Sequence, residues 1–527
     1  MREKKLVISF VIFLFASLAL LSGCSNICMD AYNYIVSDSS SESEESCSKA
    51  MNMNPYHSLF TGVTNQPYDF LWKEGRERAW EEDIIFYAET ILANHTFFTD
   101  FDTFHVEGEA GRIHYSISTP GDYTGYVYDA ILSRVSANNG ISAYNRESMV
   151  NALMGIFIDK INVLIADLYY LRDFEVKFRL AEISSTLGDI HTEIDLRDGN
   201  VFPVHVIVLY DGLFLVSVPK EIEFALYSRV LAINDICVFD IFEVFRTIVP
   251  HENEYPMRGA IQQLLMIEEL LYYLNIVDGS GTAYFTIKDT AGEISDIQLK
   301  AIRQHEFQSM LSTELVRHDF NRQFMHSRTG DRRCLITSRQ FEDGIDGDFF
   351  WYEFFPNYNL LYVRSVHFRG TQDIIEAQVS LVEQLRNWPY EKIDKFVLDI
   401  RQNTGGIRDF PSIFQFYFLS QIANDFYVLI DGRSVSRSLT VAANMRNHME
   451  SNVVIIGEPA GQPENFLMAP RIRTMPNSGL MFSFATGLSV NSCSVETTFR
   501  PDIFIPLTIT DIINNHDPVL EAIKTKR

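Results

Sequence analysis

Residues 434–436, Ser-Val-Ser, form the stretch of the chain most suited to chemistry. They follow an unbroken apolar run at 426–430, which predicts a strand buried on both faces, and they precede a helical pattern. A serine between a strand and a helix lies where backbone N–H groups point outward and can bind an oxyanion. One hypothesis is therefore that Ser436 is a nucleophile. The simpler interpretation of this stretch alone is that Ser434 or Ser436 caps the helix.

Four other short motifs contain residue types that serine chemistry uses. They are Gly-Asp-Ile-His-Thr at 188–192, a glycine pair at 405–406 soon after a predicted strand, Gly-Glu-Pro at 457–459, and Glu496 followed by Arg-Pro-Asp-Ile at 500–503. Each is weak by itself. A single histidine is more often a hydrogen-bonded polar residue than a base, a glycine pair is more often a turn, and a lone glutamate is usually solvated.

In this order the motifs resemble those of the tail-specific (C-terminal processing) serine peptidases, a family that includes the tricorn protease core and the interphotoreceptor retinoid-binding repeats. The family pattern is LGDxHT, then DLRxNxGG, then a serine, then GEPTGG, and finally E…PDI. This chain has LGDIHT, DIRQNTGG, Ser436, GEPAGQ and ETTFRPDI in the same order. The resemblance runs from about Trp80 to Ile523, and its specificity lies in the order and spacing of the motifs.

The resemblance implies a catalytic triad of serine, histidine and glutamate. Ser436 matches the nucleophile, which needs an adjacent base because a serine hydroxyl is weakly nucleophilic. His191 matches that base, and it would later protonate the leaving amine. Glu496 matches the residue that orients the imidazole and stabilises the imidazolium.

The resemblance also implies an oxyanion hole formed by the backbone N–H of Gly406, or Gly405, and that of Arg437. Arg437 stands where the family usually has a small residue, and Gln462 stands where the branches with a Ser–Lys dyad have a lysine. A dyad is therefore not expected. These departures leave a second hypothesis open, in which the chain is a catalytically degenerate protein that binds peptides or another ligand.

The fold expected from the resemblance is α/β, with a crotonase/ClpP-like catalytic layer, an N-terminal helical region and a PDZ-like insert. The residue patterns predict helices at 79–93, 126–135, 149–171 (with Ser148 a possible cap), 174–187, 241–249, 262–274 and 371–385. They predict strands at 204–210, 213–218, 230–233, 284–287, 297–299, 360–366, 395–400, 453–456, 479–484 and 503–507, and a terminal helix from 517. The predicted domains are a signal peptide (1–23), an acidic Ser-rich tether (24–64), the helical region (65–200), a PDZ-like or small α+β insert (201–300), a linker (301–347) and the catalytic domain (348–527).

The N-terminus predicts export and membrane attachment. Basic residues at 2–5 precede an apolar run at 6–21, which is typical of a secretory signal. Leu-Ser-Gly-Cys at 21–24 resembles a bacterial lipobox, and the resemblance implies cleavage before Cys24 and acylation of its thiol. The expected location is therefore the extracytoplasmic face of the cell membrane.

The composition limits the partners. The net charge of -25 and the lack of a Lys/Arg cluster argue against nucleic acid. The histidines are scattered, no HExxH occurs and the six cysteines form no CxxC pair, so neither a metal nor another cofactor is expected. The sequence thus predicts a lipid-anchored serine endopeptidase acting on peptides or proteins. A degenerate binding lipoprotein of the same fold is the main alternative, and a structural surface lipoprotein is a third.

Overall fold

The computed structural model describes residues 75–99, 122–143, 145–310, 314–318, 335–336, 350–368, 393–406, 423–448 and 453–526. The predicted signal peptide, Cys24 and the acidic tether lie outside these residues, as do most of the predicted linker and the predicted helix at 371–385. The described residues mix helices with parallel and antiparallel strands, so the predicted α/β class is confirmed.

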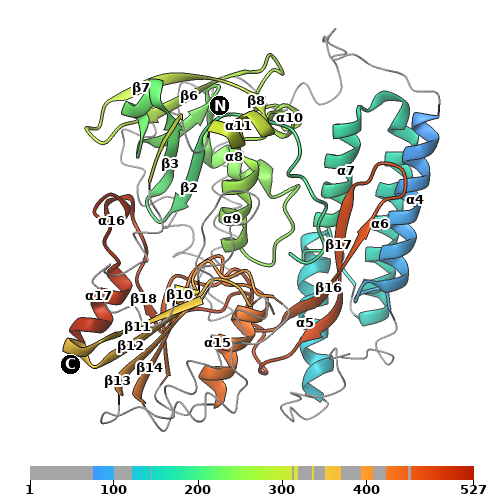
Figure 1. The fold of residues 1–527 in the computed structure, drawn as a ribbon. Coiled ribbons are helices and arrows are strands. Elements are labelled where there is room, and N and C mark those ends of the chain that lie inside the picture. Colours follow the sequence, from blue (N-terminus) through green and yellow to red (C-terminus); the bar gives the residue numbers. More distant parts are fainter. Residues whose placement is uncertain are drawn as a thin grey trace, which may run out of the picture. The chain divides into compact units, whose positions relative to one another are not determined.

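Helices fill the described part of the N-terminal region, as the sequence predicts (Figure 1). They are α4 (Arg76–Asn94), α5 (Asp122–Asn138), α6 (Arg146–Asp167), the short η3 (Leu168–Tyr170) and α7 (Asp173–Ser185). Helix α6 buries Met149, Leu153 and Phe157, which recur at every fourth position and so share one face. The predicted cap of this helix is wrong by three residues. Asn145 is the cap, because its Oδ1 accepts the N–H of Ser148 at 2.8 Å.

The stretch Arg146–Tyr170 is also long and apolar enough to cross a membrane, by length and composition. The central helix of a folded domain shares these properties. Helix α6 contacts α4, α5 and α7, and the ring of Phe157 lies 6.0 Å from that of Tyr87 in α4. The apolar face of α6 is thus used in packing between helices.

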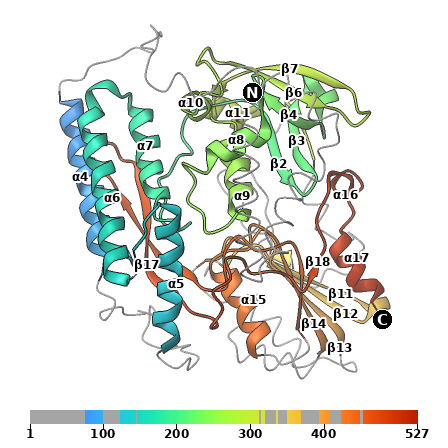
Figure 2. The ribbon, with the colours of Figure 1, turned by 180° about the vertical axis from the view of Figure 1, so that it is seen from behind.

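A long hairpin, β16 (Phe466–Thr474) and β17 (Met481–Ser489), runs along these helices in both Figure 1 and Figure 2. The ring of Phe482 lies 5.0 Å from that of Tyr87, and the N–H of Thr96 donates to the Ala485 carbonyl at 3.1 Å. The segment after the histidine motif pairs with the same strand, with Ile194 opposite Phe482. The hairpin therefore fixes the histidine motif against the helices.

The insert contains an antiparallel sheet in the order β2-β3-β4-β6-β7. Its elements are β1 (Asn200–Val201), β2 (His205–Leu209), β3 (Gly212–Pro219), η4 (Lys220–Ala225), β4 (Arg229–Ile233), β5 (Ile236–Cys237), α8 (Val238–Phe245), α9 (Tyr255–Leu264), α10 (Glu268–Tyr273), β6 (Thr282–Lys288), β7 (Ile294–Lys300), β8 (Ile302–Arg303), α11 (Gln304–Met310) and β9 (Leu315–Arg317). The predicted hairpin is present, but its two turn residues are Tyr210 and Asp211 and not Asp211-Gly212, because Gly212 begins β3 and pairs with Leu209. The single helix predicted at 262–274 is wrong, because Ile267 has an extended backbone that separates α9 from α10.

The C-terminal part contains a seven-stranded sheet in the order β10-β11-β12-β13-β14-β15-β18. The strands β12, β13, β14, β15 and β18 run parallel to one another. Its elements are β10 (Leu335–Ile336), β11 (Phe350–Phe355), η5 (Pro356–Tyr358), β12 (Leu360–Ser365), β13 (Ile393–Asp399), β14 (Ala423–Ile430), α15 (Arg437–His448), β15 (Val453–Gly457), β18 (Ile503–Phe504), α16 (Ile509–Ile513) and α17 (Pro518–Thr525).

Both faces of this sheet are covered. Leu398 and Val428 point to the face that packs against Leu439 of α15. Tyr427 and other side chains of the opposite face pack against Leu520 of α17. Burial on both faces explains why strands such as β14 lack polar alternation. The carboxyl ends of β13 and β14 carry the glycine pair and the Ser-Val-Ser segment, so the parallel sheet places both at one edge.

Candidate active site

The Ser-Val-Ser segment links the end of β14 to the start of α15, and only its second serine faces a base. Ser434 is fully buried, and its Oγ donates to the Ile400 carbonyl at 2.9 Å. Ser438 is also buried and donates to the carbonyls of Asn403 and Val435, both at 2.8 Å. Ser436 has a left-handed backbone, with φ of 59°. A non-glycine residue rarely adopts this conformation, and it is common at functional sites.

Ser436 and His191 meet, although they are 245 residues apart in the sequence. The Oγ of Ser436 lies 3.1 Å from Nε2 of His191, which is hydrogen-bonding distance for a nucleophile and its base. The imidazole is only 8% exposed and stacks on Phe466 with an interplanar angle of 19°. Phe466 begins β16, so the hairpin also sets the plane of the imidazole.

The carboxylate beside His191 belongs to Asp189 of the same motif. Its Oδ1 lies 3.4 Å from Nδ1 of His191 and accepts the backbone N–H of His191 at 3.0 Å. A separation of 3.4 Å suits an ion pair with an imidazolium better than a hydrogen bond. Accordingly, Nδ1 has no hydrogen-bond acceptor among the described residues. Asp189 therefore acts on His191 mainly through its charge.

A buried chain of hydrogen bonds fixes Asp189 from the other side. The hydroxyl of Thr192 donates to Asp189 Oδ2 at 2.7 Å, and Nε2 of His95 lies 3.1 Å from that hydroxyl oxygen. Nδ1 of His95 accepts the N–H of Phe97, so its Nε2 carries the proton and donates. Burial alone would raise the pKa of the Asp189 carboxyl, but the interactions with His191 and His95 outweigh burial and lower it. Asp189 is therefore ionised at neutral pH.

The structure does not bring Glu496 to the histidine. Glu496 is exposed, and its backbone N–H donates to Oγ of Ser494. Among the described residues, no hydrogen bond or ion pair joins its carboxylate to His191. The nearby Asp502 is structural, since its Oδ2 accepts the N–H of Ile455 at 2.7 Å and so aligns β15. The carboxylate that the structure places beside His191 is that of Asp189, whose sequence signal is its position two residues before the histidine.

The predicted oxyanion donors lie beside Ser436. A Cβ placed on Gly405 would lie 2.7 Å from Cβ of Ser436 and 2.9 Å from N of Arg437. The N–H of Gly405 already donates to Asn403 Oδ1 at 2.8 Å. That of Gly406 has no hydrogen-bond acceptor in the part of the chain that the structure describes. The N–H of Gly405 is therefore the least available of the three predicted donors.

Gly405→Ala is expected to lower the rate of any reaction at Ser436 by about 100-fold or more, because displacing a reacting group by about 1 Å can cost that much. The added methyl group would collide with the nucleophile, and the φ of 92° at Gly405 disfavours a side chain. Gly479→Ala is a matched control, because Gly479 also has a positive φ, of 72°, but has open space around it. Equal losses of rate in the two purified variants would contradict a role for the space beside Gly405.

Asp189, His191 and Glu252 also have ligand atoms within 4.8 Å of one another, close enough for a metal ion by distance. Their oxygens, however, already accept hydrogen bonds: Asp189 from Thr192 and the backbone of His191, and Glu252 from Gln462. The donor set therefore fits a polar network around His191, and no step below uses a metal.

No family model and no curated protein matches the sequence. Solved structures share parts of its architecture at low identity. Mature CPAF matches at 10% identity with a TM-score of 0.47, over 83% of this chain and 94% of that one. The tricorn protease matches at 11% identity and a TM-score of 0.32, over 76% and 36% of the two chains. A putative S41 protease from Bacteroides fragilis NCTC 9343 matches at 12% identity and a TM-score of 0.32, over 68% and 90%.

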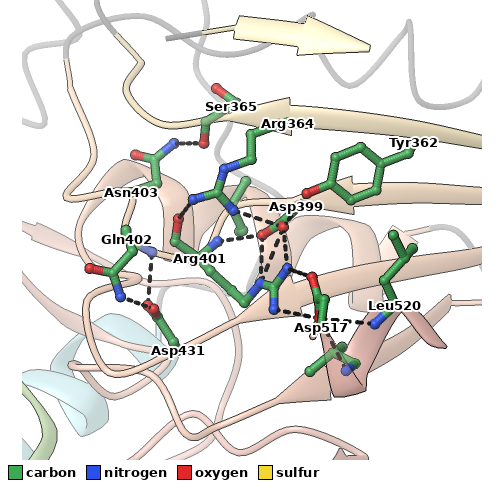
Figure 3. Close-up of polar contacts among 12 residues, drawn as sticks. Tyr362, Arg364, Ser365, Asp399, Arg401, Gln402, Asn403, Asp431, Asp517 and Leu520 are labelled. Carbon is green, nitrogen blue, oxygen red and sulfur yellow. Dashed lines mark hydrogen bonds and ion pairs between the residues drawn. The ribbon is translucent and has the colours of Figure 1, made fainter. Parts of the chain in front are cut away.

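Asn403 of the second motif, whose contact with Ser365 is drawn in Figure 3, joins the glycine loop to the Ser-Val-Ser segment. Its Nδ2 donates to the Ser365 carbonyl at 2.9 Å while its Oδ1 holds the N–H of Gly405. Its own carbonyl accepts the N–H of Val435 at 3.2 Å and the hydroxyl of Ser438. The asparagine therefore fixes the distance between the two loops that must surround a substrate carbonyl.

A buried charge network lies beneath this loop (Figure 3). The guanidinium of Arg401 bridges Asp399 and Asp517, each at 2.6 Å, and Arg364 contacts Asp399 at 2.7 Å. Asp517 also caps α17 by accepting the N–H groups of Val519 and Leu520. Burial would raise the pKa of Asp399, but the two arginines outweigh it and lower that pKa. The Asp-Ile-Arg residues of the motif are thus structural supports.

The fourth motif is structural too. Oε1 of Glu458 accepts the N–H of Leu507, and its Oε2 pairs with Arg258 of α9 at 3.0 Å. Gln462, at the position of the lysine in the dyad branches, is fully buried, and its Oε1 accepts the N–H of Ser436 at 2.5 Å. From the sequence, Gln462 is noted only because it is not the lysine of the dyad branches, so its contact with Ser436 is not predicted.

Proposed function

We propose that this protein is a serine-type peptidase that hydrolyses peptide bonds through an acyl-enzyme intermediate. The observation that carries the proposal is the 3.1 Å contact between Ser436 Oγ and His191 Nε2, at the edge of a parallel sheet and beside the glycine pair. The motif resemblance supports the same chemistry. Ser434 and Ser438 are excluded as nucleophiles by their bonds to backbone carbonyls.

In the first step, Oγ of Ser436 attacks the carbonyl carbon of the substrate while Nε2 of His191 takes the hydroxyl proton. The imidazolium that forms faces the carboxylate of Asp189, which stabilises its positive charge. The carbonyl oxygen becomes an oxyanion, for which the N–H groups of Gly406 and Arg437 are the expected donors. His191 then protonates the leaving amine, and water attacks the acyl-serine by the same route in reverse.

The base must be neutral to accept this proton. Asp189 and Glu252 raise the pKa of His191 against the opposing effect of burial. A raised pKa means that the imidazole is protonated, and so inactive as a base, below that pKa. The reaction rate is therefore expected to fall as the pH falls through the pKa of His191.

Labelling of the purified chain, from about Met51 onward, with a fluorophosphonate tests the proposal. One adduct is expected, detected by intact mass, and it should be absent in Ser436→Ala and reduced by about 10³-fold or more in rate in His191→Ala. An adduct that persists in Ser436→Ala would identify another nucleophile. A folded wild-type chain that forms no adduct would favour the degenerate peptide- or ligand-binding protein.

We also propose that the peptidase acts outside the cell as a lipid-anchored, tail-specific enzyme. The support is the N-terminal sequence, with its basic start, apolar run and Cys24 in a lipobox-like position. Metabolic labelling in a bacterial host with a fatty-acid analogue should tag the full chain. Cys24→Ala should remove the tag, and a variant that stays tagged would contradict acylation at that thiol.

A further inference from the structure

The insert places one buried carboxyl group in the active site. Glu252 lies in the segment between α8 and α9 and is only 8% exposed. Its Oε1 accepts Nε2–H of Gln462 at 2.7 Å, and its Oε2 accepts the N–H of Ile190 at 3.4 Å. None of the catalytic steps above uses this group, and neither the motifs nor the resemblance points to it.

Glu252 is connected to the nucleophile through a single side chain. Gln462 holds Glu252 with its amide nitrogen and the backbone N–H of Ser436 with its amide oxygen. The left-handed backbone of Ser436 is costly for a non-glycine residue, so it persists only where surrounding bonds hold it. The fixed oxygen of Gln462 provides one such bond, and Glu252 fixes Gln462.

The segment that carries Glu252 is itself anchored to the catalytic layer. The amide of Asn253 donates to the carbonyls of Ala460 and Thr497, at 3.3 and 3.2 Å. Ile190, whose N–H reaches Glu252, directly precedes His191. The carboxyl group of Glu252 therefore contacts both Ile190, which precedes His191, and Gln462, which holds the backbone of Ser436.

The charged and polar groups that face Glu252 are Asp189, His191, Arg134 and Gln462. Burial and the neighbouring Asp189 raise the pKa of Glu252 to about 7, against the opposing effects of the other three. Ionised Glu252 is in turn one of the anions that raise the pKa of His191. The charge on Glu252 thus affects the base directly.

We propose that Glu252 is a positioning residue of this site, which holds Ser436 in its attacking conformation through Gln462 and stabilises the imidazolium of His191 by its charge. The inference rests on the proposed serine chemistry. It assigns the insert a part in catalysis that is separate from any peptide binding.

The test compares three variants by the second-order rate of fluorophosphonate labelling across pH. Glu252→Gln removes the charge but keeps an oxygen that can accept from Gln462. Glu252→Ala removes both. Glu254→Gln is the matched control, because Glu254 lies two residues away, is exposed and pairs with Arg246 instead.

The acid limb of the pH profile is the range in which the labelling rate falls as His191 becomes protonated. Loss of the anion at residue 252 lowers the pKa of His191, so this limb should move to lower pH in both Glu252 variants and stay in place in Glu254→Gln. The plateau rate should fall by about 10- to 100-fold more in Glu252→Ala than in Glu252→Gln, because only alanine releases Gln462. A purely structural Glu252 would lower thermal stability without moving the acid limb.

The outcomes separate the inference from the function on which it depends. A wild-type chain that is not labelled refutes the serine chemistry, and the inference falls with it. A labelled wild type with an unchanged acid limb and plateau in both Glu252 variants refutes the inference alone. If Glu252→Ala does not fold, the acid limb of the isosteric Glu252→Gln decides.

Discussion

Asp189→Asn is expected to lower the rate of labelling or hydrolysis at Ser436 by about 10²- to 10⁴-fold, as the loss of the acid does in other serine–histidine sites. The substitution keeps the shape of the side chain but removes the negative charge that lies 3.4 Å from Nδ1 of His191. The imidazolium formed during the reaction is then uncompensated in a buried site. The acid limb of the pH profile should also move to lower pH, because the pKa of His191 falls when Asp189 is neutral.

Glu496→Gln should be compared with Asp189→Asn, because the two variants neutralise the two carboxylates that could orient His191. Glu496 is the residue that the motif order favours, but its side chain is exposed and makes no contact with His191 among the described residues. Its neutralisation should leave the rate within about twofold, since an exposed charge is screened by solvent. A large loss in Glu496→Gln together with a small one in Asp189→Asn would restore the original assignment.

Arg401→Met is expected to destabilise the fold by about 3–5 kcal/mol, the cost of leaving buried charges without their partner. Arg401 lies between Asp399 and Asp517, and all three side chains are almost fully buried. Both carboxylates would lose their bridging cation, although Asp399 would keep Arg364. The midpoint of urea unfolding, compared at equal slope, measures the effect.

An exposed ion pair provides the control for this loss. Arg78 pairs with Glu82 four residues along α4, with side chains that are 83% and 51% exposed. Arg78→Met should cost less than about 1 kcal/mol, as is usual for surface pairs. If Arg401→Met lowered the free energy of unfolding no more than Arg78→Met does, the buried network would stabilise the fold no more than an exposed ion pair.

The close approach of Ser436 and His191 agrees with the roles that the resemblance implies, because each residue stands in a short motif that can be read directly from the sequence. The strand before Ser436 shows in the sequence as an unbroken apolar run, and the helix after it shows as apolar residues at helical spacing. His191 stands in a short motif whose spacing to Asp189 survives folding unchanged. The α/β class followed from the same alternation of strands and helices.

The contacts that hold Asp189 and Ser436 in place could not be predicted, because they depend on which distant segments become buried together. His95 reaches Thr192 across 97 residues, and Gln462 reaches Glu252 across 210. The spacing of apolar residues along the sequence does not predict contacts between side chains so far apart. Motif order alone favoured Glu496 over Asp189, and only the exposure of one and the burial of the other distinguishes them.

The network around Arg401 has a consequence for biosynthesis. Asp517 follows every other part of the site in the chain, so a ribosome delivers it last, long after His191 has left the exit tunnel. Until then Arg401 and Asp399 cannot reach their final arrangement beneath the glycine loop. A chain that lacks Asp517 should therefore not hold the glycine loop in its final position, so that the site would be completed only after synthesis has passed residue 517.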